Sequence, residues 1–166
     1  MSQQPKSTAT AAQNFINSVA ADCPDELLAA ARSKGAINLP VVRASAALPT
    51  EAAFNAHKAG IANPVLVGEG AIIRSEAEKL GWDLSDITII EAKGEEEAAL
   101  ISAGLLRDGL QDGAELSIGA VMKGQLHTDV FMAALLNREV GLRIGNRLVH
   151  VFALYPPANM TGPILV

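Results

Sequence analysis

The chain has 166 residues, with 13 basic and 18 acidic side chains and a net charge of −5. This length indicates one domain with a hydrophobic core of its own. A pI near 5.1 without any cluster of lysine or arginine argues against nucleic acid or an anionic membrane as partner. The single Cys23 cannot form an internal disulfide, and residues 1–13 lack the features of a signal peptide. We therefore expect a cytoplasmic protein.

Residues 1–21 are expected to form a flexible N-terminal tail, and residues 22–166 the folded domain. The boundary lies at Asp22-Cys23-Pro24-Asp25-Glu26, where a proline and acidic side chains are typical of the first turn of a helix. Near the other end, residues 148–166 are uncharged, but they contain His150 and three prolines. This composition argues against a membrane-spanning helix.

Short apolar strands alternate with helices along the rest of the chain. The expected strands are residues 39–42, 64–68, 86–90 and 116–122, followed by an alternating strand over residues 148–152. The expected helices are residues 25–34, 49–60, a segment ending at Gly81, residues 94–109 and residues 126–141. Buried strands alternating with helices predict an α/β fold with a doubly wound, mostly parallel sheet and helices on both faces. Such sheets bind ligands at the carboxyl ends of their strands, which directs attention to the loops 43–49 and 123–128.

The last residues, Ile164-Leu165-Val166, are apolar and uncapped. An exposed apolar strand promotes aggregation, so we expect these residues to pair within the same sheet or against a partner chain. The sequence thus has the character of a domain truncated at its C-terminus. On this interpretation the 166 residues alone fold with an open anion site and show little of the activity of the whole protein.

The segment Met122-Lys123-Gly124-Gln125-Leu126-His127-Thr128-Asp129 is the strongest candidate site. A buried strand ends in a lysine and a glycine shortly before a helix begins, so an ammonium and free backbone N–H groups converge in an outline of an anion site. Alternatively, Lys123 is solvated, Gly124 forms a turn and His127 caps the helix. The chain has no GxxxxGK[ST] or GxGxxG motif, which disfavours a mononucleotide P-loop or a Rossmann dinucleotide site.

Three segments resemble the phosphate acetyl/butyryltransferase family. They are MKGQLHTDVFMAALLNREVGLR, the R-x-x-H-V-F pattern of residues 147–152, and GIANPVLVGEGAIIRSEAEKLGWDLS. The chain is most similar to the phosphate acyltransferase portion of proteins that also carry an enoyl-CoA hydratase domain. The resemblance covers residues 25–166, and it implies the first half of a two-domain phosphate acyltransferase fold.

The resemblance implies transfer of an acetyl- or butyryl-type group between coenzyme A and inorganic phosphate. The protein must then hold a dianion, stabilise an oxyanion and ease departure of the CoA thiolate. Lys123 and His127 are the implied catalytic residues, with His127 as proton donor to the thiolate. Gly124 and Thr128 line the phosphate side of the cleft. No metal ion and no cofactor beyond the CoA substrate is implied.

The resemblance also implies that Arg143 and Arg147 reach the CoA phosphates and that His150 lies in the substrate site. Relatives tend to have a serine before this histidine, where the present chain has Val149. This difference removes a hydroxyl group from the site. Acyl-CoA and phosphate are the expected partners, and the family's oligomers imply a homodimer. Open alternatives are a non-catalytic CoA- or phosphoanion-binding or oligomerisation module, and an inactive fragment of the enzyme.

Other side chains are given structural roles. His57 is expected at the surface, and Trp82 is expected to pack against the edge of the sheet rather than stack on adenine. Nothing near Cys23 indicates an activated thiolate. The run of Glu95, Glu96 and Glu97 is interpreted as a solvated first turn rather than a metal site, because carboxylates there complement the helix dipole.

Overall fold

The computed structural model describes residues 23–111, 113–114, 116–142, 151, 153–154 and 164–165. The chain divides into two compact units, one made of Met1–Leu27 and Val149–Val166, the other of Leu28–Leu148. The expected tail over residues 1–21 lies outside the described residues. So does the expected strand over residues 148–152, apart from Val151, which has no regular secondary structure.

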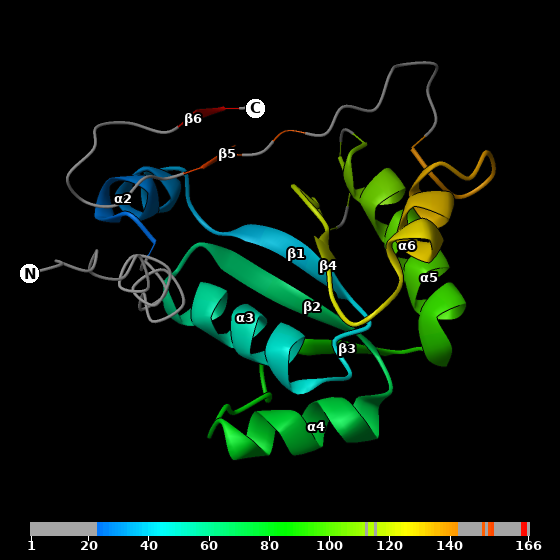
Figure 1. The fold of residues 1–166 in the computed structure, drawn as a ribbon, viewed down its shortest axis with the longest axis horizontal. Coiled ribbons are helices and arrows are strands. Elements are labelled where there is room, and N and C mark those ends of the chain that lie inside the picture. Colours follow the sequence, from blue (N-terminus) through cyan, green and yellow to red (C-terminus); the bar gives the residue numbers. More distant parts are fainter. Residues whose placement is uncertain are drawn as a thin grey trace, which may run out of the picture. The chain divides into compact units, whose positions relative to one another are not determined.

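A parallel sheet forms the centre of the larger unit (Figure 1). Its strands are β1 (Ile37–Val42), β2 (Ala62–Gly68), β3 (Thr88–Glu91) and β4 (Met122–Lys123). They lie in the order β3-β2-β1-β4, with Val41 of β1 opposite both Leu66 and Met122. The predictions of a strand at residues 39–42, 64–68 and 86–90 are confirmed, with small shifts at the ends.

All five expected helices are present: α2 (Asp25–Ser33), α3 (Ala47–Lys58), α4 (Gly70–Lys79), α5 (Gly94–Gly109) and α6 (Thr128–Leu135). α6 is shorter than predicted, because the side chain of Asn137 accepts hydrogen bonds from the N–H groups of Glu139 and Val140 and forms a turn. None of the helices in the described ranges is long and apolar enough to cross a bilayer.

Helices cover both faces of the sheet, as Figure 1 shows for α3 and α4 on one side and α5 and α6 on the other. Neighbouring residues of a strand point to opposite faces. Thus Val41 packs in the core cluster that contains residues of α3 and α4, whereas Val42 packs in the cluster that contains residues of α5 and α6. The predicted doubly wound α/β class is confirmed.

The strand expected at residues 116–122 is mostly absent. Ile118 forms an isolated bridge with Asn38, and the paired strand β4 begins only at Met122. On the β1 side of this pairing, the carbonyl groups of Asn38 and Val42 accept hydrogen bonds from the N–H groups of Gly119 and Gly124. Pro40 lies midway between Asn38 and Val42, so its backbone faces the same side of β1, but a proline has no N–H to donate. The hydrogen bonds between β1 and residues 116–122 are therefore interrupted in the middle.

The end of the chain differs from the expectation. β6 (Ile164–Leu165) pairs in antiparallel fashion with β5 (Ala153–Leu154), and the two form a separate two-stranded sheet. The prediction of a strand is confirmed for these two residues, but its placement in the main sheet is wrong, and pairing against a partner chain stays a prediction. A preceding segment of the same chain pairs with one edge of β6 instead, because an antiparallel pair needs only a short connection. Val166 lies outside the described residues.

Trp82 is buried and His57 is exposed, as predicted. Trp82 is 7% exposed and packs beside Phe54, with a distance of 5.4 Å between ring centroids. His57 is exposed on α3, with its ring 6.0 Å from that of Trp82. Cys23 is an exposed free thiol.

Candidate active site

The sheet order places two loops side by side at the edge where parallel strands end. β1 and β4 are neighbours, but α3, which follows β1, covers one face and α6, which follows β4, covers the other. This change of face is the topological switch point where doubly wound sheets bind their ligands. The loops 43–49 and 123–128, which the sequence indicated, therefore meet at the expected place.

Arg43 is the first residue after β1 and connects this loop to two others. Among the described residues it is the one non-glycine residue with a positive φ, at 51°. This conformation costs roughly 1–2 kcal/mol in an L-residue. Its Nη1 donates hydrogen bonds to Glu95 Oε1 at 2.9 Å and to the carbonyl oxygen of Gln125 at 3.1 Å. Arg43 thereby links β1 to the start of α5 and to the loop after β4.

Glu95 connects Arg43 to His127. Its Oε2 accepts a hydrogen bond from the backbone N–H of His127 at 2.8 Å and lies 2.7 Å from His127 Nδ1. The Glu95 side chain is 22% exposed. Glu95 lies in the first turn of α5, as predicted, but its expected solvated role is wrong. The carboxylate bridges Arg43, 52 residues away in the sequence, and His127, 32 residues away. Glu97 does act within the first turn, where it accepts from the N–H of Lys93.

The contacts between Glu95 and His127 lower the pKa of Glu95 and raise the pKa of His127, so the charged form of each group is favoured. The backbone N–H of His127 is the largest cause of the lowered pKa of Glu95, followed by the imidazole and the charge of Arg43. The hydrogen bond to Glu95 is the largest cause of the raised pKa of His127, and the charge of Lys123 opposes it. The imidazole is thus more readily protonated than usual, although its side chain is 79% exposed.

A second carboxylate lies on the other side of Arg43. Glu69 precedes α4, and its Oε1 lies 3.8 Å from Arg43 Nε and accepts a hydrogen bond from the N–H of Gly94. The pKa of Glu69 is lowered, chiefly by the Ser45 hydroxyl. Within the described part of the chain, Arg43 Nε and Glu69 Oε2 are buried without a hydrogen-bond partner. The guanidinium is thus held between two carboxylates from the ends of neighbouring strands.

Lys123, Gly124 and Thr128 lie around this network. Lys123 ends β4, is exposed, and has no ion-pair partner among the described residues. Thr128 is the first residue of α6, where N–H groups of the first turn lack intrahelical acceptors. The backbone N–H of His127, which precedes this first turn, already donates a hydrogen bond to Glu95.

Gly124 has a structural reason to be glycine. A Cβ atom at this position would lie within 2.7 Å of the carbonyl oxygen of Arg43 and closer still to that of Val42. Its own N–H donates to the Val42 carbonyl at 2.9 Å. The close approach observed is therefore to the end of β1, and binding of substrate by Gly124 remains a prediction.

The predicted substrate residues Arg143, Arg147 and His150 lie outside the described residues. No group of three or more His, Cys, Asp or Glu side chains with the arrangement of a metal site occurs among the residues that are described. The structure therefore brings together Lys123, Gly124, His127 and Thr128, and adds Arg43, Glu69 and Glu95 to them.

Sequence reasoning missed these three additional residues for a specific reason. Each follows a different strand, β1, β2 and β3, so their proximity depends on the order of strands in the sheet. A usable signal was present, since a charged residue follows each of the first three predicted strands within five positions. In a parallel sheet those positions share one edge.

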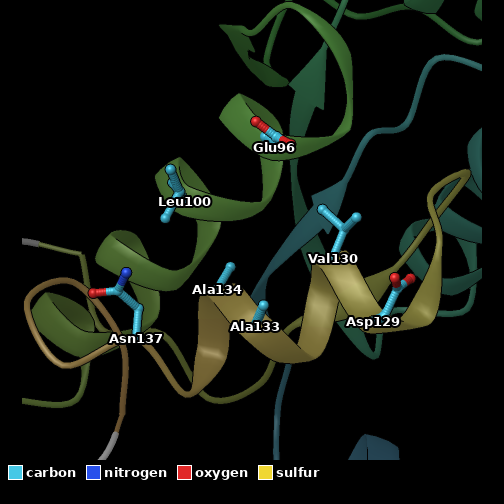
Figure 2. Close-up of a pocket in the computed structure, with 7 residues that line it drawn as sticks. All are labelled: Glu96, Leu100, Asp129, Val130, Ala133, Ala134 and Asn137. Carbon is cyan, nitrogen blue, oxygen red and sulfur yellow. The ribbon is translucent and has the colours of Figure 1, made fainter.

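A groove of about 400 Å³ lies between α5 and α6 (Figure 2). Leu100, Val130, Ala133 and Ala134 form its apolar lining. Glu96 and Asp129, which stand near the first turns of the two helices, are at one end, and Asn137 also lines it. Two of the lining residues, Glu96 and Asp129, lie one and two positions after Glu95 and His127 in the sequence.

Sequence comparisons identify relatives of this chain. No protein-family model matches the chain. The phosphate butyryltransferase of Clostridium acetobutylicum is 35% identical over 127 residues, which make up 76% of this chain and 40% of that protein. A phosphate acetyltransferase of Rickettsia felis is 33% identical over 114 residues, or 69% of this chain and 30% of that protein. The resemblance to the phosphate acyltransferases is confirmed.

Structural comparison supports the fold. The EutD phosphotransacetylase from Staphylococcus aureus matches with a TM-score of 0.50 and 16% sequence identity, over 84% of this chain and 49% of that chain. At this level of identity the match concerns the fold alone. The chain spans about 40% of the length of the clostridial relative.

Proposed function

We propose that this chain takes part in acyl transfer between coenzyme A and inorganic phosphate, with an acetyl- or butyryl-type group. The similarity to phosphate butyryltransferase over three-quarters of the chain is the observation that carries the proposal. The cationic residues at the switch point are consistent with it, because both substrates are anionic. Coenzyme A is a substrate here, and the reaction uses no metal ion or other cofactor.

In the proposed reaction, a phosphate oxygen forms a bond with the carbonyl carbon of the thioester. The carbon–sulfur bond then breaks, and its electron pair goes to the sulfur of coenzyme A. Lys123 and the first-turn N–H groups of α6 hold the phosphate, because an ammonium and a helix N-terminus both attract anions. His127 donates a proton to the departing sulfur, and in the reverse direction it accepts the thiol proton.

The remaining contacts to substrate are assigned from the resemblance. Thr128 donates its hydroxyl to phosphate, and Gly124 leaves room for it. Arg143 and Arg147 bind phosphates of coenzyme A, and His150 lies beside them. Residues 22–166 carry this function. We further propose a cytoplasmic homodimer that binds neither nucleic acid nor membranes, consistent with a net charge of −5 and a single cysteine.

The test is the release of free thiol from acetyl-CoA or butyryl-CoA, with and without phosphate, by the protein that carries this sequence. We expect release that requires phosphate and saturates with it. Thiol release that ignores phosphate would instead indicate hydrolysis. Calorimetric binding of coenzyme A without any turnover would favour a non-catalytic binding module.

A further inference from the structure

We propose that Glu95 is a positioning residue for His127, and that Arg43 holds Glu95 in the place where it can act. Glu95 would set the orientation and the tautomer of the imidazole without touching substrate. This inference rests on the proposed role of His127 as proton donor, and it assigns a function to a carboxylate outside the loop that contains His127.

Two contacts from one oxygen atom fix His127. Oε2 of Glu95 accepts the backbone N–H of His127 and lies 2.7 Å from Nδ1 of the same residue. A carboxylate that is ionised can only accept hydrogen bonds, so Nδ1 must carry a proton. The other ring nitrogen, Nε2, then faces away from Glu95 and is the atom available to exchange a proton with a substrate.

Arg43 fixes the other oxygen of the carboxylate. Its Nη1 lies 2.9 Å from Glu95 Oε1 and also donates to the Gln125 carbonyl, in the loop that carries His127. The guanidinium therefore contacts both the carboxylate and the backbone next to the histidine. A ring that is 79% exposed has little packing to hold it, so this polar frame is what restrains its orientation.

The charges around His127 come from three elements. Glu95 lies at the start of α5, Lys123 ends β4, and Asp129 lies in the first turn of α6. Glu95 makes the direct contact and is the largest of the influences that favour the imidazolium, whereas Lys123 opposes it. A carboxylate on Nδ1 both selects the tautomer and stabilises the imidazolium, which is the form that donates a proton.

A simple structural role is the competing explanation. Glu95 accepts the N–H of the residue that precedes α6, and this contact alone would help the helix to begin. The two explanations differ in what Glu95→Gln does. Loss of a helix contact lowers stability, whereas loss of a positioning residue also moves the titration of His127 and the pH dependence of kcat.

The experiment compares Glu95→Gln with Glu96→Gln, which removes the same charge from the neighbouring residue of α5. Glu96 makes no hydrogen bond or ion pair within the described residues, so it serves as the matched control. NMR titration of labelled histidine follows His127, whose signal is assigned by its absence in His127→Asn. Steady-state kinetics across pH provide kcat and the KM for phosphate.

In Glu95→Gln we expect the titration midpoint of the His127 imidazole to fall to a lower pH. The part of the kcat–pH profile that depends on this titration should move to lower pH with it. kcat should fall on the order of tenfold, a part of the 10² to 10⁴ that a general acid supplies, with little change in the KM for phosphate. Glu96→Gln should leave the His127 midpoint and the kcat profile in place. Glu95→Asp keeps the charge at the start of α5 but shortens its reach, and its midpoint should lie between those of parent and Glu95→Gln.

Two results would overturn the inference in distinguishable ways. An unchanged His127 midpoint in Glu95→Gln, with activity still lost in His127→Asn, would reject the role of Glu95 and leave the proposed reaction standing. A lowered midpoint with an unchanged kcat profile, and a fully active His127→Asn, would show that His127 is not the proton donor. The second result would reject the positioning role together with that part of the proposed function.

Discussion

Lys123 is the exposed cation at the end of β4, and its replacement tests the anion site. Because Lys123 has no ion-pair partner among the described residues, its charge is available to a ligand rather than to the core. We expect Lys123→Ala to raise the KM for phosphate and to lower kcat, with an unchanged melting temperature. Lys79→Ala on α4 breaks only an ion pair to Glu76 and is the control. Kinetics identical to the parent would reject an anion-binding role for Lys123.

His127→Asn tests proton transfer. The substitution keeps a polar side chain before α6 but removes the titratable ring, so steps that move a proton should slow by roughly 10² to 10⁴ at neutral pH. If His127 only precedes the helix and moves no proton, the substitution should leave kcat nearly unchanged. Measurement of kcat against pH decides, since a mutant profile with the same shape and height as the parent would support this structural role.

At the scale of residues, the sequence predicts the proximity of side chains that are close together along the chain. Lys123, His127 and Thr128 lie within six positions, so a strand ending and a helix beginning bring them together whatever the rest of the chain does. Glu95 was misjudged, because its partners Arg43 and His127 lie 52 and 32 positions away. Charge near a helix N-terminus explains a single acidic residue without revealing what else it contacts.

Gly124 tests the contact between β1 and β4 at the scale of elements. A Cβ at this position would overlap the carbonyl groups of Val42 and Arg43, so Gly124→Ala should lower the free energy of unfolding by about 1–3 kcal/mol. The matched control is Gly104→Ala in the middle of α5. A Cβ there meets no atom within 4 Å, and replacing a helical glycine should raise stability by about 0.5–1 kcal/mol. Urea unfolding that ranks the two variants in the opposite order would contradict this packing.

The link between α5 and α6 predicts a particular dependence of stability on pH. The lowered pKa of Glu95 makes its contribution present above the ordinary value of 4.5 and lost as pH falls through the folded value. The raised pKa of His127 makes its contribution complete below the ordinary value of 6.5 and lost as pH rises through the folded value. The destabilisation caused by Glu95→Gln should therefore be largest between pH 4.5 and 6.5. Urea unfolding of parent and variant across pH measures this difference, and a constant difference would contradict the ion pair.

Elements were predictable wherever their own sequence decides them. Gly35, Gly60 and Gly81 lie just beyond α2, α3 and α4 with positive φ angles, as expected of glycines that end helices. The strand over residues 116–122 was overpredicted for a reason outside that segment. Its neighbour β1 carries Pro40, and the missing N–H of a proline weakens the strand beside it rather than its own.

The order of the strands organises the whole molecule. Because β4 joins the sheet beside β1, the loops after these two strands meet where the covering helices change sides. The sequence predicted the α/β class from alternating strands and helices, but not the neighbours of each strand. That order determines that Arg43 contacts Glu95 and that Glu95 contacts His127, and it is therefore the level at which the site is assembled.

The proposed reaction at this site is the transfer of an acyl group to phosphate. The most direct measurement is ³¹P NMR of the reaction of butyryl-CoA or acetyl-CoA with inorganic phosphate, alongside assay of free thiol. We predict acyl phosphate in equal amount to released coenzyme A, with both reduced in Lys123→Ala. Thiol released without any acyl phosphate, or no reaction of either thioester with the whole protein that carries this sequence, would contradict the proposed reaction.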